Sequence, residues 1–326
     1  MKAINIKAGI IGAAGYTAGE LIRILLNHPT VVEIHCQSNS QAGKNVTDVH
    51  ADLIGECNLK FERSIDYEHL DIIFLCKGHG ESVKFLTNET LPKVLKIIDL
   101  SHDFRLKKEG NDFTYALPEL NKDAIKKSNK LANPGCFATS IQLGLLPAAH
   151  SNIIKSDIHV SGITGSTGAG QSLSPTSHFS WRNNNISVYK AFVHQHLKEI
   201  GESLTQVSND TIYKINFIPY RGNFTRGIIT TSYFSTDASL EDVKIIYEKF
   251  YQDTPFTYVT DRNPDLKQVV NSNKALVYLE KHEDQLMVIS MIDNLLKGAS
   301  GQAVQNMNLI FGLAENTGLK LKSTAF

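Results

Sequence analysis

Apolar residues in the first third of the chain gather in short runs of strand length, separated by helical or polar segments. Residues 5–11 predict a buried strand that leads into glycines, and the pattern from Ala18 to Leu26 predicts a helix that ends before Pro29. Further strands are predicted at 31–36, 72–76 and 94–100. Strands that alternate with helices are typical of a parallel sheet, so this region is expected to be α/β.

The pattern changes from residue 154 onward, where apolar and polar residues alternate along several segments. Such alternation predicts strands with one buried face, at 154–163, 213–220, 227–236, 275–282 and 286–292. The segments LKEIGESLTQV and LEDVKIIYEKFY predict amphipathic helices that cover one side of the sheet. We therefore expect a mostly antiparallel sheet, followed by a C-terminal helix and tail.

Composition indicates the number of domains and the kind of partner. The 326 residues are 42% hydrophobic, enough for two domains with their own cores. Because 33 basic and 33 acidic residues cancel, the charge does not favour nucleic acid or an anionic membrane, and we expect small molecules or further copies of the chain as partners. No apolar run approaches the ~18 residues of a membrane span. The four cysteines include no C-x-x-C pair, which fits a reducing cytoplasm.

A glycine-rich segment joins the first predicted strand to the first helix. Gly9, Gly12 and Gly15 form G-x-x-G-x-x-G there, where glycines let backbone amides approach a pyrophosphate near a helix N-terminus. The alternative is a glycine turn without a ligand. After the second strand, Ser38 and its neighbours stand where an NAD enzyme would place an acid, and Lys44 is nearby. This favours NADP.

One of the four cysteines has a distinctive setting. Cys136 follows Asn133-Pro134-Gly135 and precedes an apolar helical run, so it is expected at a helix N-terminus. Amides and the helix dipole there stabilise a thiolate, the form that attacks an acyl carbon. A small buried apolar residue is the alternative for a lone cysteine. Cys36 and Cys76 are predicted to be core strand residues.

His194-Gln195-His196 is a candidate source of an acid or base, with Glu199 three residues after His196. A satisfied structural histidine is the alternative for either ring, and the block does not supply the third and fourth ligands of a zinc site, so no metal is expected. The two rings are expected to point to different sides if the block is a helix or tight turn, and to share one face if it is extended. The segment GITGSTGAG (162–170) offers backbone donors for a phosphate or oxyanion, or else is a flexible hairpin loop.

Taken in order along the chain, these segments resemble the N-acetyl-gamma-glutamyl-phosphate reductase family, part of the semialdehyde dehydrogenase group. The resemblance rests on GIIGAAGYTAGELIRILLNHP, IDLSHDFRL, ALPEL, ANPGCFATS, SGITGSTGAG, YK followed by HQHLKEI, TRGIITTSYF and DNLLKGASGQAVQNMNLIFG. It implies a Rossmann-type parallel sheet domain, 1–137 with 298–326, and an inserted α+β catalytic and dimerisation domain, 138–297.

The resemblance also implies an oxidoreductase of arginine biosynthesis. It would reduce an N-acyl-gamma-glutamyl phosphate with NADPH through a Cys136 thioester, as a homodimer or homotetramer. His196 would be the acid/base, with Glu199 and His194 beside it. The implied cofactor contacts are Gly9, Gly12, Ala13, Ala14, Gly15, Tyr16, Thr17, Ser38, Lys44, Gly168 and Asn294. The implied substrate contacts are Arg105, Asn133, Gly135, Ser166 and Arg226.

Two segments depart from the family pattern. Ser38-Asn39 stands where Ser-Arg is usual, which removes one partner for a 2′-phosphate, and Gly78-His79-Gly80 stands where Pro-His-Gly is usual. Whether the substrate amine carries an acetyl or a succinyl group stays open. A related aspartyl- or aminoadipyl-phosphate enzyme and a non-catalytic NADP-sensing protein are the alternative functions.

Overall fold

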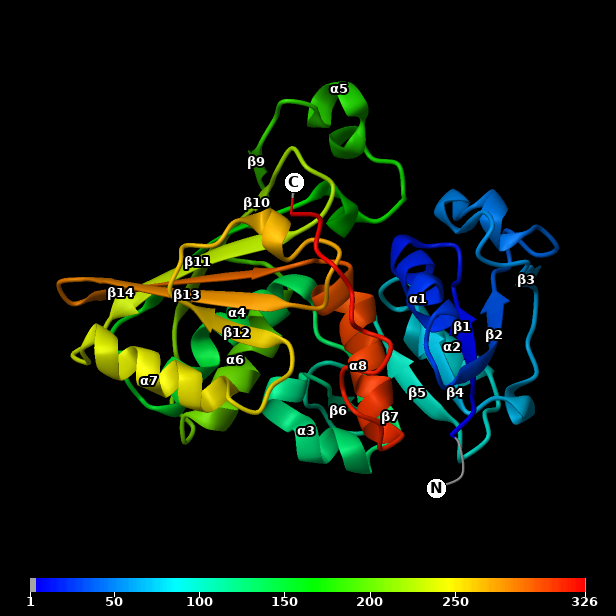
Figure 1. Cartoon of the computed structure of the whole chain (residues 1–326), viewed down its shortest axis with the longest axis horizontal. Helices are drawn as coiled ribbons and strands as arrows, with labels where there is room; N and C mark the ends of the chain where they lie inside the picture. The colour runs from blue at the N-terminus through cyan, green and yellow to red at the C-terminus, as the bar shows by residue number, and fades with distance from the viewer. Residues whose placement is uncertain (1–3, 326) are drawn as a thin grey trace. The chain divides into compact units, whose positions relative to one another are not determined.

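The computed structural model describes residues 4–325 and divides the chain into two compact units. Unit 1 contains the residues up to Pro134 together with Ala299–Lys320, and unit 2 contains Gly135–Gly298 and the residues from Leu321 onward. Each unit is built around its own seven-stranded sheet (Figure 1). We describe the two units separately.

The sheet of unit 1 is parallel throughout, with the strand order β3-β2-β1-β4-β5-β7-β6. Its strands are β1 (Ile6–Ile11), β2 (Val31–Gln37), β3 (Phe61–Glu62), β4 (Ile72–Leu75), β5 (Lys96–Asp99), β6 (Thr114–Tyr115) and β7 (Lys130–Ala132). The central strand β4 is buried along its whole length, as its apolar run requires. The predicted α/β fold with a parallel sheet is confirmed.

The helices of unit 1 come from both ends of the chain. They are α1 (Tyr16–Leu26), α2 (Glu81–Asn88), α3 (Pro118–Lys127) and α8 (Gly301–Ile310), with short 3-10 turns at Val46–Asp48, Ala51–Leu53 and Tyr67–His69. Helix α8 packs on α1 and α3, and all ten of its residues are buried. The Ser300 hydroxyl before it donates to the Thr17 carbonyl at 2.7 Å, which ties the C-terminal segment to the start of α1.

The sheet of unit 2 is mixed and mostly antiparallel, in the order β12-β13-β14-β11-β8-β10-β9. Its strands are β8 (Ile158–Thr164), β9 (Ser187–Val188), β10 (Ile215–Arg221), β11 (Ile228–Ser235), β12 (Thr257–Thr260), β13 (Ala275–His282) and β14 (Gln285–Ile292). The pairs β8/β10 and β12/β13 are parallel and the other four are antiparallel. The alternation in the sequence therefore predicted the strands and their dominant pairing.

Helix α4 (Cys136–His150) packs against β11 and β14 of this sheet and contacts α6 (His196–Val207) and α7 (Leu240–Tyr251). Thirteen of its fifteen residues are buried, which suits a helix that is apolar on every side. Pro147 lies inside it and cannot donate to the Leu143 carbonyl. The Tyr251 hydroxyl donates to that carbonyl at 2.6 Å instead, so α7 satisfies the group that the proline leaves open.

The remaining short helical elements of unit 2 lie in its connections. They are η4 (Ser166–Ala169), η5 (Pro175–Ser177), α5 (Phe179–Arg182), η6 (Leu266–Gln268) and the π-helical turn η7 (Leu296–Ser300), whose last residues enter unit 1.

Candidate active site

Cys136 is the first residue of α4, as the sequence predicts, and its side chain is half-buried. The N-cap residue Gly135 has extended backbone angles (φ −70°, ψ 150°), so the chain turns sharply into the helix at the cysteine. Gly298 packs directly on this turn: a Cβ there would lie 2.9 Å from the Cβ of Cys136 and 3.2 Å from the Asp293 carbonyl oxygen. Unit 2 thus holds Cys136 by close backbone packing.

Glu199 connects the cysteine turn to the histidine block. The Gly135 amide donates to Glu199 Oε2 at 3.1 Å, and Glu199 Oε1 lies 3.8 Å from His196 Nε2. Both Glu199 and His196 are buried. Glu199 and His196 sit three residues apart in the first turn of α6, so the predicted orientation of His196 by Glu199 has a geometric basis. The same carboxylate also fixes the amide that precedes Cys136.

His194 occupies an aromatic environment next to His196. Its ring meets Phe137 and Phe217 edge-on, with centroids 5.7 and 5.4 Å away. Burial, and then the positive charges of Lys190 and Arg221, lower the pKa of His194 to about 4. His194 is therefore neutral at physiological pH.

The two histidine rings lie together, as expected for a block that is not wholly helical. Their centroids lie 4.6 Å apart with the ring planes at 77°, and the His196 amide donates to His194 Nδ1 at 3.3 Å. The reason is that His194 lies before the helix, whereas His196 is its first residue, so helical side-chain directions do not apply to the pair.

Tyr189, Lys190 and Arg221 also belong to this region, and the sequence reasoning did not single them out. Burial and then the Cys136 thiolate raise the pKa of Tyr189 to about 12, while Arg221 opposes them. The Arg221 guanidinium lies 4.7 Å from the centroid of the Tyr189 ring. Two cationic groups and a tyrosine hydroxyl thus adjoin the cysteine and histidine side chains. No spacing pattern marks Arg221, because it merely ends an alternating strand.

The other cysteines have different surroundings. Cys36 is buried in β2, where burial raises the pKa of its thiol to about 12, so its prediction as a core strand residue is confirmed. Cys76 lies directly after β4 and is half-buried, so its prediction as a core strand residue is wrong, although burial still raises the pKa of its thiol well above the usual range. None of the four cysteines, all of which lie within the described residues, forms a disulfide bond.

Arg226, Ser166, Gly168 and Asn294 lie in and around the loop after β8. Arg226 forms an ion pair with the fully buried Asp293, with nitrogen to oxygen distances of 3.1 and 3.0 Å. Asn294 accepts from the Gly227 amide at 2.7 Å and donates to Thr167 at 3.0 Å. These bonds define the loop, of which Gly168 is exposed.

Arg105 and Asn133 lie in unit 1. Arg105 is buried, and its guanidinium donates to the backbone carbonyls of Asn133 and Leu100 at 2.9 and 3.0 Å. The Asn133 amide group donates to the Ala299 carbonyl and accepts from Asn306, both at 3.1 Å. Both side chains therefore also stabilise the end of unit 1 that leads into Pro134.

The glycines at the start of unit 1 have different structural roles. Gly9 lies inside β1 rather than at the turn, and a Cβ there would be 2.7 Å from Leu70 and 2.9 Å from Ile65. Gly12 has φ +84° and approaches the Cys76 carbonyl. Gly15 is the N-cap of α1. The turn proper therefore spans Gly12–Gly15.

The residues between and after these glycines differ in burial. Ala13 is buried, and its carbonyl accepts from His50 at 2.8 Å. Tyr16 and Thr17 form the first turn of α1, with Tyr16 exposed.

A cavity of about 300 Å³ adjoins this turn. It is lined by Gly12, Ala14, Gln37, Ser38, Asn39, Ser40 and Lys77. Ser38, expected beside the cofactor, is among them. Lys44, also expected there, instead donates to Gln41 at 3.0 Å on the surface, and Lys77 takes a place that sequence reasoning did not assign.

One group of potential metal ligands occurs among residues 4–325: His79, His102 and Asp103, whose ligand atoms lie within 4.8 Å of one another. The Asp103 carboxylate accepts from the amides of Gly80 and Val83 at 2.7 and 3.3 Å. It thus caps the start of α2, and this role accounts for its position without an ion.

The comparisons with known proteins cover both units. Residues 7–128 match the family model for the NAD binding domain of semialdehyde dehydrogenase, and residues 136–294 match the model for its dimerisation domain. N-acetyl-gamma-glutamyl-phosphate reductase of Parabacteroides distasonis is 57% identical over 321 residues, which cover 98% of this chain and 100% of the relative. The chain belongs to the N-acetyl-gamma-glutamyl-phosphate reductase family. The enzymes of that name from Bacteroides thetaiotaomicron and Flavobacterium johnsoniae are 56% and 54% identical over the same shares.

Solved structures support the fold of this family member. Aspartate semialdehyde dehydrogenase II of Vibrio cholerae has a TM-score of 0.75 at 18% identity, over 94% of this chain and 99% of that one. The Candida albicans aspartate semialdehyde dehydrogenase with NADP has a TM-score of 0.68 at 16% identity, over 96% and 99%. Within residues 4–325, the helices are too short or too polar to cross a membrane.

Proposed function

We propose that the chain catalyses the NADPH-dependent reduction of an N-acyl-gamma-glutamyl phosphate to the N-acyl-glutamate 5-semialdehyde and phosphate, in arginine biosynthesis. The relatives that carry this reductase name align over nearly the whole of both chains, which supports the assignment. The observation that carries the mechanism is the contact of Glu199 with both the Gly135 amide and His196, because it links a nucleophile turn to an acid/base.

Cys136 is proposed as the nucleophile. Its position at the start of α4 places the positive end of the helix dipole and the first-turn amides beside the sulfur, and both favour the thiolate. The thiolate attacks the acyl carbon, a carbon–sulfur bond forms, and the carbon–oxygen bond to phosphate breaks. The product is a thioester on Cys136 and free phosphate.

His196 is proposed as the acid/base, oriented by Glu199. After reduction of the thioester, the oxygen of the resulting hemithioacetal carries negative charge, and His196 would donate a proton to it and remove one when the aldehyde leaves. The Gly135 turn, fixed by the same carboxylate, would hold the sulfur in place. His194, neutral and packed among aromatic rings, would support His196 rather than exchange protons.

The dinucleotide is proposed to bind at the Gly12–Gly15 turn of unit 1. A Cβ at Gly12 would lie 2.7 Å from the Cys76 carbonyl oxygen, so the turn needs glycine there, and the adjoining cavity can accept a polar ligand. NADPH, when bound, supplies the hydride that reduces the acyl group. We infer NADP rather than NAD because the described residues that line the cavity include no acid for a ribose 2′-hydroxyl.

Arg221 is proposed as a further contact for the substrate's carboxylate or phosphate, because its planar guanidinium can bind either group and adjoins Tyr189 near Cys136. Arg105 and Arg226 stay candidates for the same role, although both already form the bonds described above.

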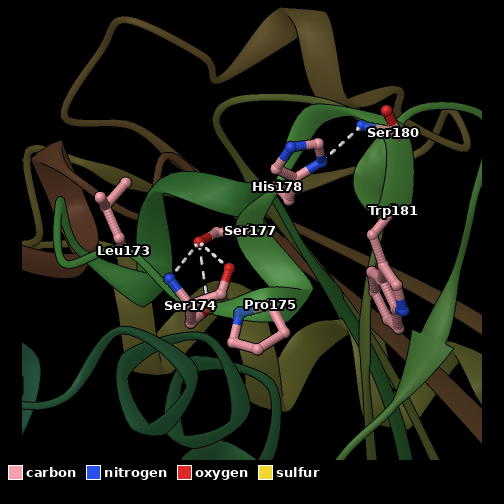
Figure 2. A pocket seen from close by; sticks show the side chains of 7 residues that line it. All are labelled: Leu173, Ser174, Pro175, Ser177, His178, Ser180 and Trp181. Atoms are coloured by element: carbon pink, nitrogen blue, oxygen red, sulfur yellow. Dashed lines mark hydrogen bonds between the residues drawn. The ribbon is translucent and has the colours of Figure 1, made fainter.

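Self-association through unit 2, as a homodimer or homotetramer in the cytoplasm, is also proposed. The matching family model is that of a dimerisation domain, and large apolar side chains are exposed between residues 173 and 193. Leu173 is fully exposed and Phe179 is 76% exposed. A cavity of about 760 Å³ in this segment is lined by Leu173, Pro175 and Trp181 among other residues. Figure 2 shows their side chains. Exposed apolar groups in such number are typical of a surface that another protein covers.

The reaction is tested by the reverse assay, oxidation of a semialdehyde with NADP and phosphate. We expect turnover with N-acetyl- or N-succinyl-glutamate semialdehyde, and the ratio of their kcat/KM values identifies the acyl group. A higher kcat/KM for aspartate semialdehyde, or no phosphate-dependent oxidation of any of them, would overturn the proposal.

A further inference from the structure

The cavity beside the glycine turn lies where three neighbouring parallel strands end. Gly12 follows β1, Ser38 follows β2, and Lys77 stands two residues beyond β4. Because β2, β1 and β4 are adjacent and parallel, their carboxyl ends meet at one edge of the sheet, which is where ligands of such sheets bind. All seven lining residues belong to unit 1.

The charge of this cavity comes from a single residue. Among its seven lining residues, all described, Lys77 carries the only formal charge, and the others offer amides, hydroxyls or small apolar groups. The hydroxyls of Ser38 and Ser40 and the amide of Asn39 can donate hydrogen bonds to an anion. Such a set of donors around one ammonium group suits a phosphate, and the seven residues include no carboxylate to accept from a ribose 2′-hydroxyl.

The surroundings of Lys77 leave its charge available to a ligand. Its Cγ would lie 3.5 Å from a Cβ at Gly12, so the stem runs along the turn, and its Nζ is 5.7 Å from the Phe85 ring centroid. Lys84 and, to a smaller extent, Lys77 lower the pKa of Glu81. Glu81 accepts a hydrogen bond from Lys84 at 2.7 Å. This acid thus has its own cationic partner.

We propose that Lys77 binds the 2′-phosphate of NADP, together with Ser38 and Asn39, and so determines the dinucleotide preference of this chain. The proposal rests on the proposed function for the presence of a dinucleotide at the glycine turn. It places the cationic contact with the phosphate in the segment after β4, at Lys77, whereas the family pattern has an arginine at position 39 in the segment after β2.

The test measures equilibrium binding by calorimetry and needs no turnover. The ligands are NADP, NAD, adenosine 2′,5′-bisphosphate and adenosine 5′-monophosphate, titrated into the wild type, Lys77→Met and Lys77→Arg. Lys126→Met is the matched control, since Lys126 is an exposed lysine of the same unit that does not line the cavity. A lost charge-assisted hydrogen bond to phosphate should weaken NADP and the bisphosphate by roughly 10- to 100-fold in Lys77→Met. Affinity for NAD and the monophosphate should change by less than about threefold, and Lys77→Arg should keep most of the preference.

Several results would overturn the assignment. An equal loss of both dinucleotides would place Lys77 on the pyrophosphate or in the structure of the turn, and an unchanged preference would remove it from the phosphate site. A wild type that binds NAD as well as NADP would contradict it too. Failure of the proposed function is seen separately, as a wild type that binds NADP but does not oxidise any semialdehyde in the presence of phosphate.

Discussion

One of the two candidate sites of this chain depends on backbone conformation, and the other depends on buried side chains. The glycine turn of unit 1 depends on backbone shape: Gly12 adopts φ +84° against the Cys76 carbonyl, and Gly15 caps α1. The cysteine site of unit 2 depends on buried side chains, with Glu199 joining the Gly135 amide to His196. Backbone sites bind a ligand that many enzymes share, whereas buried polar side chains tune the acidity that a particular reaction needs.

This difference predicts how each site responds to substitution. Changes in the cysteine site should lower the rate and leave dinucleotide affinity intact, because its groups lie in another unit. Changes at the edge of unit 1, such as those at Lys77, should do the opposite. The predictions below test this separation, starting with the largest expected effect.

Cys136→Ser should lower kcat by three powers of ten or more, because removal of a covalent nucleophile abolishes the thioester route. NADP affinity, measured by calorimetry, should stay within about threefold of wild type, because Cys136 is not expected to contribute to dinucleotide binding. Cys57→Ser is the control, since Cys57 is a half-buried thiol of unit 1. A Cys136→Ser enzyme with more than about a hundredth of the wild-type rate would contradict covalent catalysis.

His196→Asn should lower kcat by roughly 10²- to 10⁴-fold, the usual contribution of general acid/base catalysis. His194→Asn should act mainly on stability or binding, because His194 packs among aromatic rings as a neutral group. The measurement is kcat for each variant, with the fold checked by circular dichroism. A larger loss of kcat at His194 would reverse the assignment, and near-full activity in both variants would remove the pair from the mechanism.

Gly298→Ala should reduce both stability and kcat, because the new methyl group would meet Cys136 and the Asp293 carbonyl at 2.9 and 3.2 Å. Overpacking of this kind costs about 1 to 3 kcal/mol in the free energy of unfolding. Gly201→Ala in α6 is the matched control, since a methyl group there has no neighbour within 4 Å and should stabilise the helix by about 0.5 to 1 kcal/mol. Urea unfolding measures the free energy of unfolding of both variants. Equal stability of the two would contradict close packing at Cys136.

The smallest predicted effect concerns pH. The pKa of His194 is about 4 in the folded protein, against 6.5 for an unperturbed histidine. The contribution of its neutral ring to the stability of the fold is therefore fully present above pH 6.5. This contribution is lost as pH falls towards 4, because the unfolded chain binds the proton first. Wild type should therefore lose more stability between pH 7 and pH 5 than His194→Asn does. His282→Asn, at an exposed position, is the control, and parallel profiles for wild type and His194→Asn would contradict the lowered pKa.

Much of the architecture follows from the sequence pattern. The apolar runs predicted β1, β2, β4 and β5, and the alternation from residue 154 onward predicted five strands of the second sheet. These elements could be predicted because periodicity reports which side of an element is buried, and burial is the main determinant of both sheets. The turn before Cys136 could be predicted because Pro-Gly before an apolar run is a strong local signal.

What could not be predicted depends on which elements meet in space. Lys77 and Arg221 are single charges at strand ends, and only the order of strands in each sheet brings Lys77 to Gly12 and Arg221 to Tyr189. Gly9 looked like part of the turn by its spacing, yet the side chains of Leu70 and Ile65 require glycine within the strand. The contact of the two histidine rings depends on where α6 begins, a boundary that sequence patterns define only within a few residues.

The most direct test of the mechanism is to look for the acyl group on Cys136. The enzyme is mixed with NADP and N-acetyl- or N-succinyl-glutamate semialdehyde in the absence of phosphate, and its mass is measured intact and after proteolysis. We predict the formation of about one NADPH per active site, matched by one acyl group on the peptide that contains Cys136, and release of that group when phosphate is added. Continuous NADPH formation without an adduct, or an acyl group on Cys36, Cys57 or Cys76, would contradict a thioester mechanism at Cys136.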